Sequence, residues 1–310
     1  MDSPNRDLDN GSTPDPRLPL ELEREIFIYA ILSDIQDPTN LFLVAKRVRE
    51  WLFPIAFKIV IVCPRRFFPV PFLELSSYQQ YGSYVQFLLL SDVNSVSDNF
   101  KPLMPIFNEC LAQCPNITDL GLWCNDPPVT LESLINLSAL SRLSMDAHHL
   151  HKLFQSLDPI PETEREATGI ALFPRITQLN MLRTLWMPSP DCELFVGALG
   201  YHFPRITHFA HSHYLWNLEN TGLLELVLRK FKKLKVFVLW KQAYNELAVD
   251  REFVLSVKDE RIVTMLTIWE KDWEREVRGT GMGMWMLADR ILEERRSKQV
   301  INLAEILPLS

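Results

Sequence analysis

The pentapeptide FPRIT occurs twice in this chain, at Phe173–Thr177 and again at Phe203–Thr207. Both copies run on into a pattern of the form apolar-x-x-apolar-x-apolar. Two copies of one motif at neighbouring places indicate a repeating structural unit. The copies begin this pattern at Ile176/Leu179/Met181 and at Ile206/Phe209/His211.

The same pattern recurs elsewhere in the chain, and alternation at its end is typical of a β-strand. Helix-like stretches at 102–113, 192–202 and 218–231 precede three of the copies, and Pro or Lys follows each stretch. Pro stops a helix because it cannot supply the next N–H. The predicted unit is therefore a helix, a stop and a strand. Its further copies are Val85/Leu88/Leu90, Ile117/Leu120/Leu122, Leu140/Leu143/Met145, Leu234/Phe237/Leu239 and Val263/Leu266/Ile268.

This unit resembles the leucine-rich repeat. The family spacing L-x-x-L-x-L-x-x-N is complete once, as Ile117, Leu120, Leu122 and Asn125. The other copies lack the Asn, so the resemblance implies an irregular solenoid. The alternative is an ordinary α/β domain in which the patterns coincide by chance.

The N-terminal stretch LPLELEREIF, Leu18–Phe27, predicts a helix from about residue 20 to 33. Asp37-Pro38 predicts the start of a second helix, and 46–57 a third. Two segments resemble the F-box. The pattern L-P-x-E-L-x-x-x-I-F is followed at 18–27, and a later L-x-x-V-x-K-R is held by Leu41, Val44, Lys46 and Arg47. The sequence departs from the family at Val48, where a Trp is usual, and has Trp51 one turn later.

The F-box resemblance implies a partner and a function. An F-box binds the Skp adaptor of a cullin–RING ubiquitin ligase through apolar residues of its short helices. The alternative is that these residues only form the core of a small helical cap. The side chains that would contact the adaptor are Leu18, Pro19, Leu22, Ile26, Phe27, Leu41 and Val44.

We therefore expect an α/β fold in which an N-terminal helical F-box-like block at 18–62 precedes an irregular leucine-rich-repeat-like solenoid at 63–310. Residues 1–17 are expected to be a disordered tail, and 284–298 a C-terminal capping helix. This layout resembles fungal F-box proteins. It implies a substrate-recognition adaptor of a Skp–cullin–F-box ubiquitin ligase. The alternative function is a stand-alone leucine-rich-repeat scaffold for protein interactions, with a degenerate F-box.

The strand register predicts a target-binding face. Between the inward apolar positions, Trp123, Trp240 and Trp269 fall at one equivalent position. Trp is enriched at binding hot spots, so these residues are expected to contact an unknown target protein. The alternative is that the C-terminal segment 284–298 covers them. Polar contacts to the target are expected from Gln178, Asn180 and His208.

Composition limits the other function classes. The chain has 310 residues, 47% of them hydrophobic, and a formal net charge of −7, so nucleic acid is not an expected partner. There is no apolar run that could cross a bilayer and no signal peptide, so no membrane partner is expected. Five cysteines, read as reduced, suggest a cytoplasmic or nuclear protein.

No enzymatic chemistry is predicted. The spacing G-x-G-x-G at Gly279–Gly283 differs from the dinucleotide motif G-x-G-x-x-G, and a nucleotide-binding enzyme is the third alternative. The His residues lack partners at ligand spacing, and Cys110, Cys114 and Cys124 lack the C-x-x-C pattern of zinc sites. No catalytic residue, metal site or cofactor is therefore expected.

Overall fold

The computed structural model describes most of the chain as two compact units, and each unit is considered by itself. The N-terminal unit is Met1–Ala56 and the sheet unit is Phe57–Ser310. The structure describes residues 18–32, 39–63, 66–68, 75–91, 106–124, 127–155, 171–182, 189–212, 221–241, 259–266 and 270–298. The predicted tail at 1–17, Asn125 and Trp269 lie outside these ranges.

The N-terminal unit contains three helices: α1 (Leu20–Leu32), α2 (Thr39–Phe42) and α3 (Lys46–Ala56). Both α1 and α2 pack against α3. The α3 side chains of Val48 and Leu52 are completely buried. Val48 and Leu52 therefore form the buried side of α3.

The sheet unit is built on one nine-stranded sheet in the order β2-β1-β3-β4-β5-β6-β7-β8-β9. Only β2 runs antiparallel to its neighbour; the other neighbouring strands are parallel. The strands are β1 (Ile59–Cys63), β2 (Arg66–Phe68), β3 (Phe87–Ser91), β4 (Asp119–Trp123), β5 (Arg142–Met145), β6 (Gln178–Met181), β7 (His208–Ser212), β8 (Val236–Lys241) and β9 (Ile262–Leu266).

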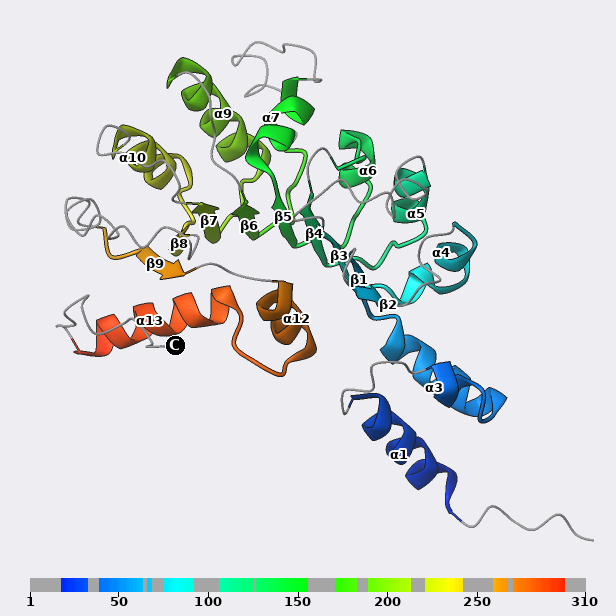
Figure 1. Ribbon diagram of the computed structural model, residues 1–310. Coiled ribbons are helices and arrows are strands. Elements are labelled where there is room, and N and C mark those ends of the chain that lie inside the picture. The colour runs from blue at the N-terminus through cyan, green and yellow to red at the C-terminus, as the bar shows by residue number, and fades with distance from the viewer. Residues whose placement is uncertain are drawn as a thin grey trace, which may run out of the picture. The chain divides into compact units, whose positions relative to one another are not determined.

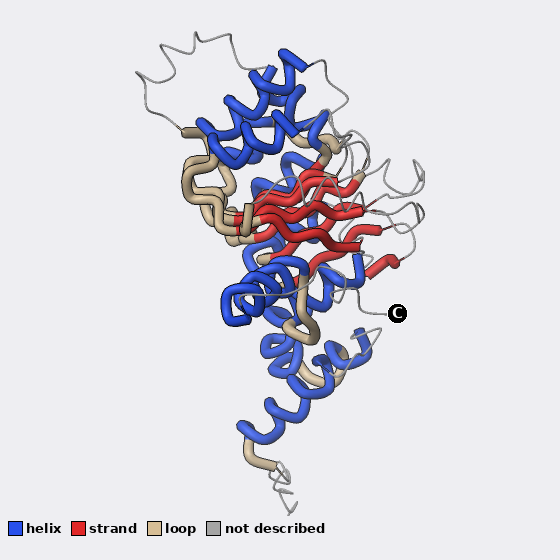
Figure 2. The backbone as a smooth tube through the Cα atoms, turned by 90° about the vertical axis from the view of Figure 1, so that its left-hand side faces the viewer, coloured by secondary structure: helices blue, strands red, loops and turns tan. Residues whose placement is uncertain are grey.

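Helices lie on both faces of this sheet. Parallel neighbours need a crossover to return the chain to the starting edge, and helices between the strands serve as these crossovers. Figure 1 shows α4–α10 along one side of the sheet and α12 and α13 on the other side, and Figure 2 shows the same layers edge-on. The helices are α4 (Leu75–Tyr81) with the 3-10 turn η2 (Gly82–Tyr84), α5 (Phe107–Ala112), α6 (Leu131–Ile135), α7 (Ala147–Gln155), α9 (Ser189–His202), α10 (Thr221–Lys230), α12 (Glu270–Arg278) and α13 (Met284–Lys298).

The apolar pattern in the sequence corresponds to one buried row across the sheet. Residues from six copies of the pattern pair side by side from β3 to β8, and all six are buried. Phe209 and Phe237, at the end of the row, stack with ring centroids 5.4 Å apart. The row is Leu88, Leu120, Leu143, Leu179, Phe209 and Phe237.

The predicted fold class is nevertheless wrong in its architecture. The structure is an α/β arrangement, a single sheet with interleaved helices, and not the predicted leucine-rich-repeat-like solenoid. The pattern misled because any buried parallel strand that follows a crossover helix produces it. The predicted capping helix 284–298 does form, as α13, but it lies across the face of β7–β9.

The last copy of the pattern was also placed four residues too far along the chain, with Leu266 aligned to Phe237. Val263 pairs with Val238, and Phe237 pairs with Ile262. The inferred equivalence of Trp269 with Trp240 therefore fails, because Met265 is the residue paired with Trp240.

Candidate functional site

An exposed apolar stripe runs along α1. Leu22, Ile26 and Tyr29 stand four and then three residues apart, so they share one side of the helix. Their exposed fractions are 47%, 54% and 75%, and Leu18, just before the helix, is 46% exposed. We call Leu18, Leu22, Ile26 and Tyr29 the α1 stripe. Exposed apolar side chains that gather on one surface often mark an interaction site.

Another side of α1 holds the helix on α3. Phe27 and Ala30 are half-buried on that side, and no α1 residue is fully buried. Arg47 Nη2 donates to both carboxylate oxygens of Glu23, at 2.8 and 2.9 Å. Since α1 is attached by this side, its apolar stripe stays accessible.

A second exposed apolar pair lies at the turn between α2 and α3. Leu43 and Val44 are both exposed, whereas Leu41 is half-buried. The turn is supported by an edge-to-face contact of Phe42 with Phe53, with ring centroids 5.1 Å apart. Val44 therefore extends the apolar surface of the unit.

The seven residues predicted to contact the adaptor thus divide into two groups. Five are exposed, so the alternative in which all seven only form a core does not describe them. Phe27 and Leu41 are half-buried and serve the packing of the unit. The exposed five are Leu18, Pro19, Leu22, Ile26 and Val44.

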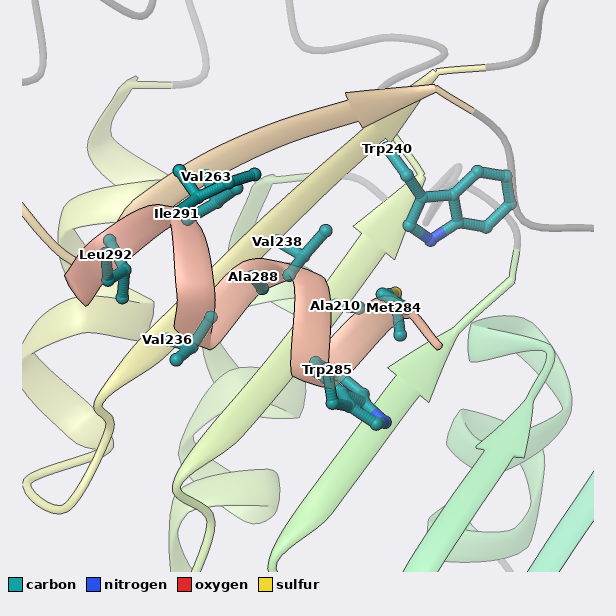
Figure 3. Close-up of a cluster of buried hydrophobic side chains, with 10 residues drawn as sticks. All are labelled: Ala210, Val236, Val238, Trp240, Val263, Met284, Trp285, Ala288, Ile291 and Leu292. Carbon is teal, nitrogen blue, oxygen red and sulfur yellow. The ribbon is translucent and has the colours of Figure 1, made fainter. Parts of the chain in front are cut away.

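The tryptophans predicted to bind a target lie in a different environment. Trp123 and Trp240 are buried, with exposed fractions of 8% and 5%. Trp240 packs with Met284 and other residues of α13, as Figure 3 shows. Trp123 packs with Trp273 of α12. The expected exposure of both side chains is wrong, and for Trp240 the alternative of a C-terminal cover is confirmed.

The indole N–H groups of these tryptophans belong to a buried hydrogen-bond network. Trp240 Nε1 donates to Asn180 Oδ1 at 3.2 Å, and Asn180 Nδ2 donates to Ser144 Oγ at 2.9 Å. Trp123 Nε1 donates to the same Ser144 oxygen at 2.8 Å. Satisfied polar groups of this kind stabilise a buried face. Asn180, predicted to contact a target, is buried within this network.

A cluster of charged groups joins α12 to the sheet. Arg142 Nη1 donates to Glu276 Oε1 at 2.7 Å and lies 3.6 Å from Asp119 Oδ2. Trp273 Nε1 donates to Asp119 Oδ1 at 3.3 Å. Burial raises the pKa of Asp119 to about 7, and the nearby Glu276 raises it further, against the opposing effects of Arg142 and Trp273. Burial likewise raises the pKa of Glu276.

A cavity of about 30 Å³ lies beside this cluster. Its lining includes Asp119, Arg142, Gln178 and Glu276. The buried Gln178 Oε1 has no hydrogen-bond partner among the residues that the structure describes. A space of this size holds about one water molecule, so the cavity is too small for an organic substrate.

His208 connects the sheet to α13. Its Nε2 lies 3.1 Å from Asp289 Oδ2, and its ring meets Trp285 edge-on at 5.5 Å between centroids. Burial lowers the pKa of His208, although Asp289 opposes the effect. His208 is thus placed for an internal contact, and a role in target binding stays a prediction for it as for Gln178.

Sequence reasoning missed the charged cluster, although one signal was available. Asp119, Arg142, Gln178 and His208 occupy equivalent positions on adjacent strands. The predicted register already aligned these polar residues in a row. The acidic partner from α12, Glu276, carried no such signal because it lies 134 residues from Arg142.

The glycine-rich loop has a structural explanation. Gly279 has a φ of 69°, which glycine adopts readily and other residues rarely do. A Cβ at Gly283 would collide with the Glu276 carboxylate. These glycines let the chain turn tightly between α12 and α13.

Within the described ranges, no group of three or more His, Cys, Asp or Glu residues is arranged to hold a metal ion. None of the described helices has the length and apolar character needed to cross a membrane. Comparison with family models and with curated proteins finds no match to this chain.

Proposed function

We propose that this protein is a substrate-recognition adaptor of a Skp–cullin–F-box ubiquitin ligase, and that its N-terminal unit binds the Skp adaptor. The observation that carries the proposal is the α1 stripe: apolar side chains at the F-box-like positions face solvent, while α1 is held on α3 by another side. The ubiquitin transfer would be catalysed by other subunits, in the cytoplasm or nucleus.

The binding free energy would come mainly from burial of the stripe. Leu22 and Ile26 each expose about half of their side chain, so burial against a partner contributes about 1 kcal/mol for each. Leu18, Tyr29 and Val44 would enlarge the same apolar contact. A cluster of this kind commonly dominates an interface.

The sheet unit would carry the recognition of the target. It is the larger of the two units, Phe57–Ser310 against Met1–Ala56. The face of its sheet opposite α4–α10 is covered by α12 and α13. A target would therefore bind at surfaces other than the buried tryptophans.

The test is co-purification with the Skp adaptor. Wild type should recover the adaptor, and Leu22→Asp and Ile26→Asp should each lose it, because a carboxylate cannot be buried in an apolar contact without a large cost. The matched control is Leu194→Asp, the same change at a 69% exposed position on α9 of the sheet unit. It should recover the adaptor as wild type does. If wild type recovers none, the proposal fails and the protein acts as a stand-alone interaction scaffold.

A further inference from the structure

The two FPRIT copies and the related FKKLK form one type of turn, placed side by side. Each turn leads into a strand of the neighbouring trio β6, β7 and β8. Gln178 pairs with His208, and His208 with Val236, so the residues three positions earlier are also equivalent. Those residues are Arg175, Arg205 and Lys233.

The turn geometry points these cations outward. In two of the turns, Ile206 N–H donates to the Phe203 carbonyl at 3.3 Å and Leu234 N–H to the Phe231 carbonyl at 3.0 Å. Hydrogen bonds of this type close β-turns, in which the two central residues form the tip. The Phe at the start of each turn is buried and the central residues are exposed. We call Arg175, Arg205, Lys232 and Lys233 the basic turn row.

The charges of this row are not neutralised within the part of the chain that the structure describes. None of the four side chains is in an ion pair there. Arg175 uses one nitrogen to reach the Ser138 carbonyl, which fixes its position and leaves its charge unpaired. On a chain of net charge −7, a row of unpaired cations is a local exception.

The row has defined ends. At the corresponding turn before β5 the central residues are Ser138 and Ala139, which are uncharged. Beyond β8, the turn before β9 contains Glu260 and Arg261, and Arg261 is paired with Asp259 at 2.6 Å. The free positive charge is thus confined to three adjacent turns. Exposed Arg229, Lys230 and Lys235 lie close to it in the sequence.

We propose that the basic turn row is a binding surface for an extended acidic segment of a partner protein. Adjacent strands lie about 4.8 Å apart, so the three turns span about 10 Å. An extended segment advances about 6.8 Å every two residues, so two carboxylates at alternate positions fall within this span. The exposed guanidinium groups suit carboxylates because each can donate two parallel hydrogen bonds.

A protein segment fits this surface better than single-stranded nucleic acid. Nucleic-acid strands bind through cations together with aromatic rings on which the bases stack. The aromatic residues of these turns, Phe173, Phe203 and Phe231, are all buried. A long polyanion would also meet the net negative charge of the chain beyond the row.

The probe for the test is a fluorescein-labelled peptide of about eleven alternating Glu and Ser residues, with a Gln–Ser peptide as the neutral control. Binding is followed by fluorescence anisotropy. The Glu peptide should bind, and its affinity should fall between about 50 and about 300 mM NaCl because salt screens exposed charges. The Gln peptide should not bind.

Charge reversal locates the surface. The triple variant Arg175→Glu, Arg205→Glu, Lys233→Glu should weaken peptide binding by at least about tenfold, since several exposed ion pairs are lost together. Arg205→Lys should retain binding, and so should Arg24→Glu, a reversal at an exposed position of α1. The substituted positions are exposed, and a melting curve confirms that the triple variant is folded.

The outcomes decide the inference separately from the proposed function. Unchanged peptide affinity in the folded triple variant would overturn it. So would tighter binding of an oligothymidine through the same three residues, which would make the surface a nucleic-acid site. The row lies in the sheet unit, so Leu22→Asp should abolish adaptor recovery and leave peptide binding intact.

Discussion

The α1 stripe and the tryptophan face of the sheet differ in what covers them. Both were expected from sequence to be contact surfaces rich in large apolar side chains. On α1 the side chains of Leu22, Ile26 and Tyr29 face solvent, whereas Trp123 and Trp240 lie beneath α12 and α13. The chain supplies its own partner for the sheet face and none, within the described residues, for the α1 stripe. An apolar row in a sequence therefore indicates a contact but not whether its partner is internal.

The largest effect expected from this comparison is on stability. Trp240→Ala should lower the free energy of unfolding of the sheet unit by about 4 kcal/mol, because it leaves a cavity beneath α13 and removes the hydrogen bond to Asn180. Tyr29→Ala should change the free energy of unfolding by less than about 0.5 kcal/mol. Urea unfolding followed by circular dichroism measures both. Equal effects of the two changes would erase the distinction between the two surfaces.

The charged cluster under α12 should make stability depend on pH. Burial raises the folded-state pKa of Asp119 to about 7 from its ordinary value of 3.8. A raised pKa means that the folded state binds the proton more tightly, so the stabilisation is complete below about pH 4 and is lost as the pH rises through 7. Glu276 acts in the same direction.

The change that isolates this effect is Asp119→Asn. Between pH 5 and 8, wild type should lose on the order of 2 kcal/mol more in its free energy of unfolding than the variant does. His208 titrates in the opposite sense, but it is present in both proteins, so the difference between them reports Asp119. Tryptophan fluorescence during urea unfolding at each pH provides the measurement. Parallel pH profiles for the two proteins would show that Asp119 does not titrate in this range.

A smaller effect on the free energy of unfolding is expected in the loop between α12 and α13. In Gly283→Ala the added methyl group must displace the Glu276 carboxylate, which is held by Arg142. The free energy of unfolding should fall by about 1–2 kcal/mol. Gly197→Ala is the matched control, because a Cβ there meets no atom within 4 Å. Thermal melting compares the two. If Gly283→Ala is as stable as Gly197→Ala, the Glu276 carboxylate is not packed closely against Gly283.

The smallest effect is expected in the N-terminal unit. Arg47→Ala removes the ion pair to Glu23, and because Arg47 is about half exposed the loss should be only about 0.5 kcal/mol. Adaptor binding should weaken modestly, since α1 would be less firmly held on α3. Lys46→Ala is the comparison, because its ion pair with Glu50 lies within α3 and does not hold α1. It separates the loss of an ion pair as such from the loss of the contact that positions α1. Equal adaptor affinities for the two variants would argue against a positioning role for Arg47.

The sequence anticipated local structure better than architecture. Strand positions and register from β3 to β8 followed from the apolar pattern, because a buried strand needs its inward side chains at fixed positions. The architecture could not be obtained in this way, since the same local pattern serves a solenoid and an ordinary α/β sheet. At β9 the predicted register was wrong by four residues, because Leu266, the residue chosen, and Ile262, the residue that pairs with Phe237, are both apolar.

The candidate sites were anticipated to different degrees for a physical reason. The α1 residues were identified from one short stretch through its resemblance to the F-box, and residues four apart on a helix share a side whatever the remaining fold is. The burial of Trp240 depends on α13, which begins at Met284, more than forty residues later in the chain. Burial by a distant segment leaves no local signature. The basic turn row was overlooked because its cations are adjacent only through the pairing of β6, β7 and β8.

The central claim is that the α1 stripe is the docking surface for the Skp adaptor, and amide hydrogen exchange tests it most directly. Exchange is measured on the full chain with and without purified adaptor. We predict that the adaptor slows exchange at Leu18–Leu32 and around Leu43–Val44 and leaves exchange in α10 of the sheet unit unchanged. In Leu22→Asp the adaptor should not slow exchange along α1. Unchanged exchange along α1 under conditions in which the adaptor binds would contradict it.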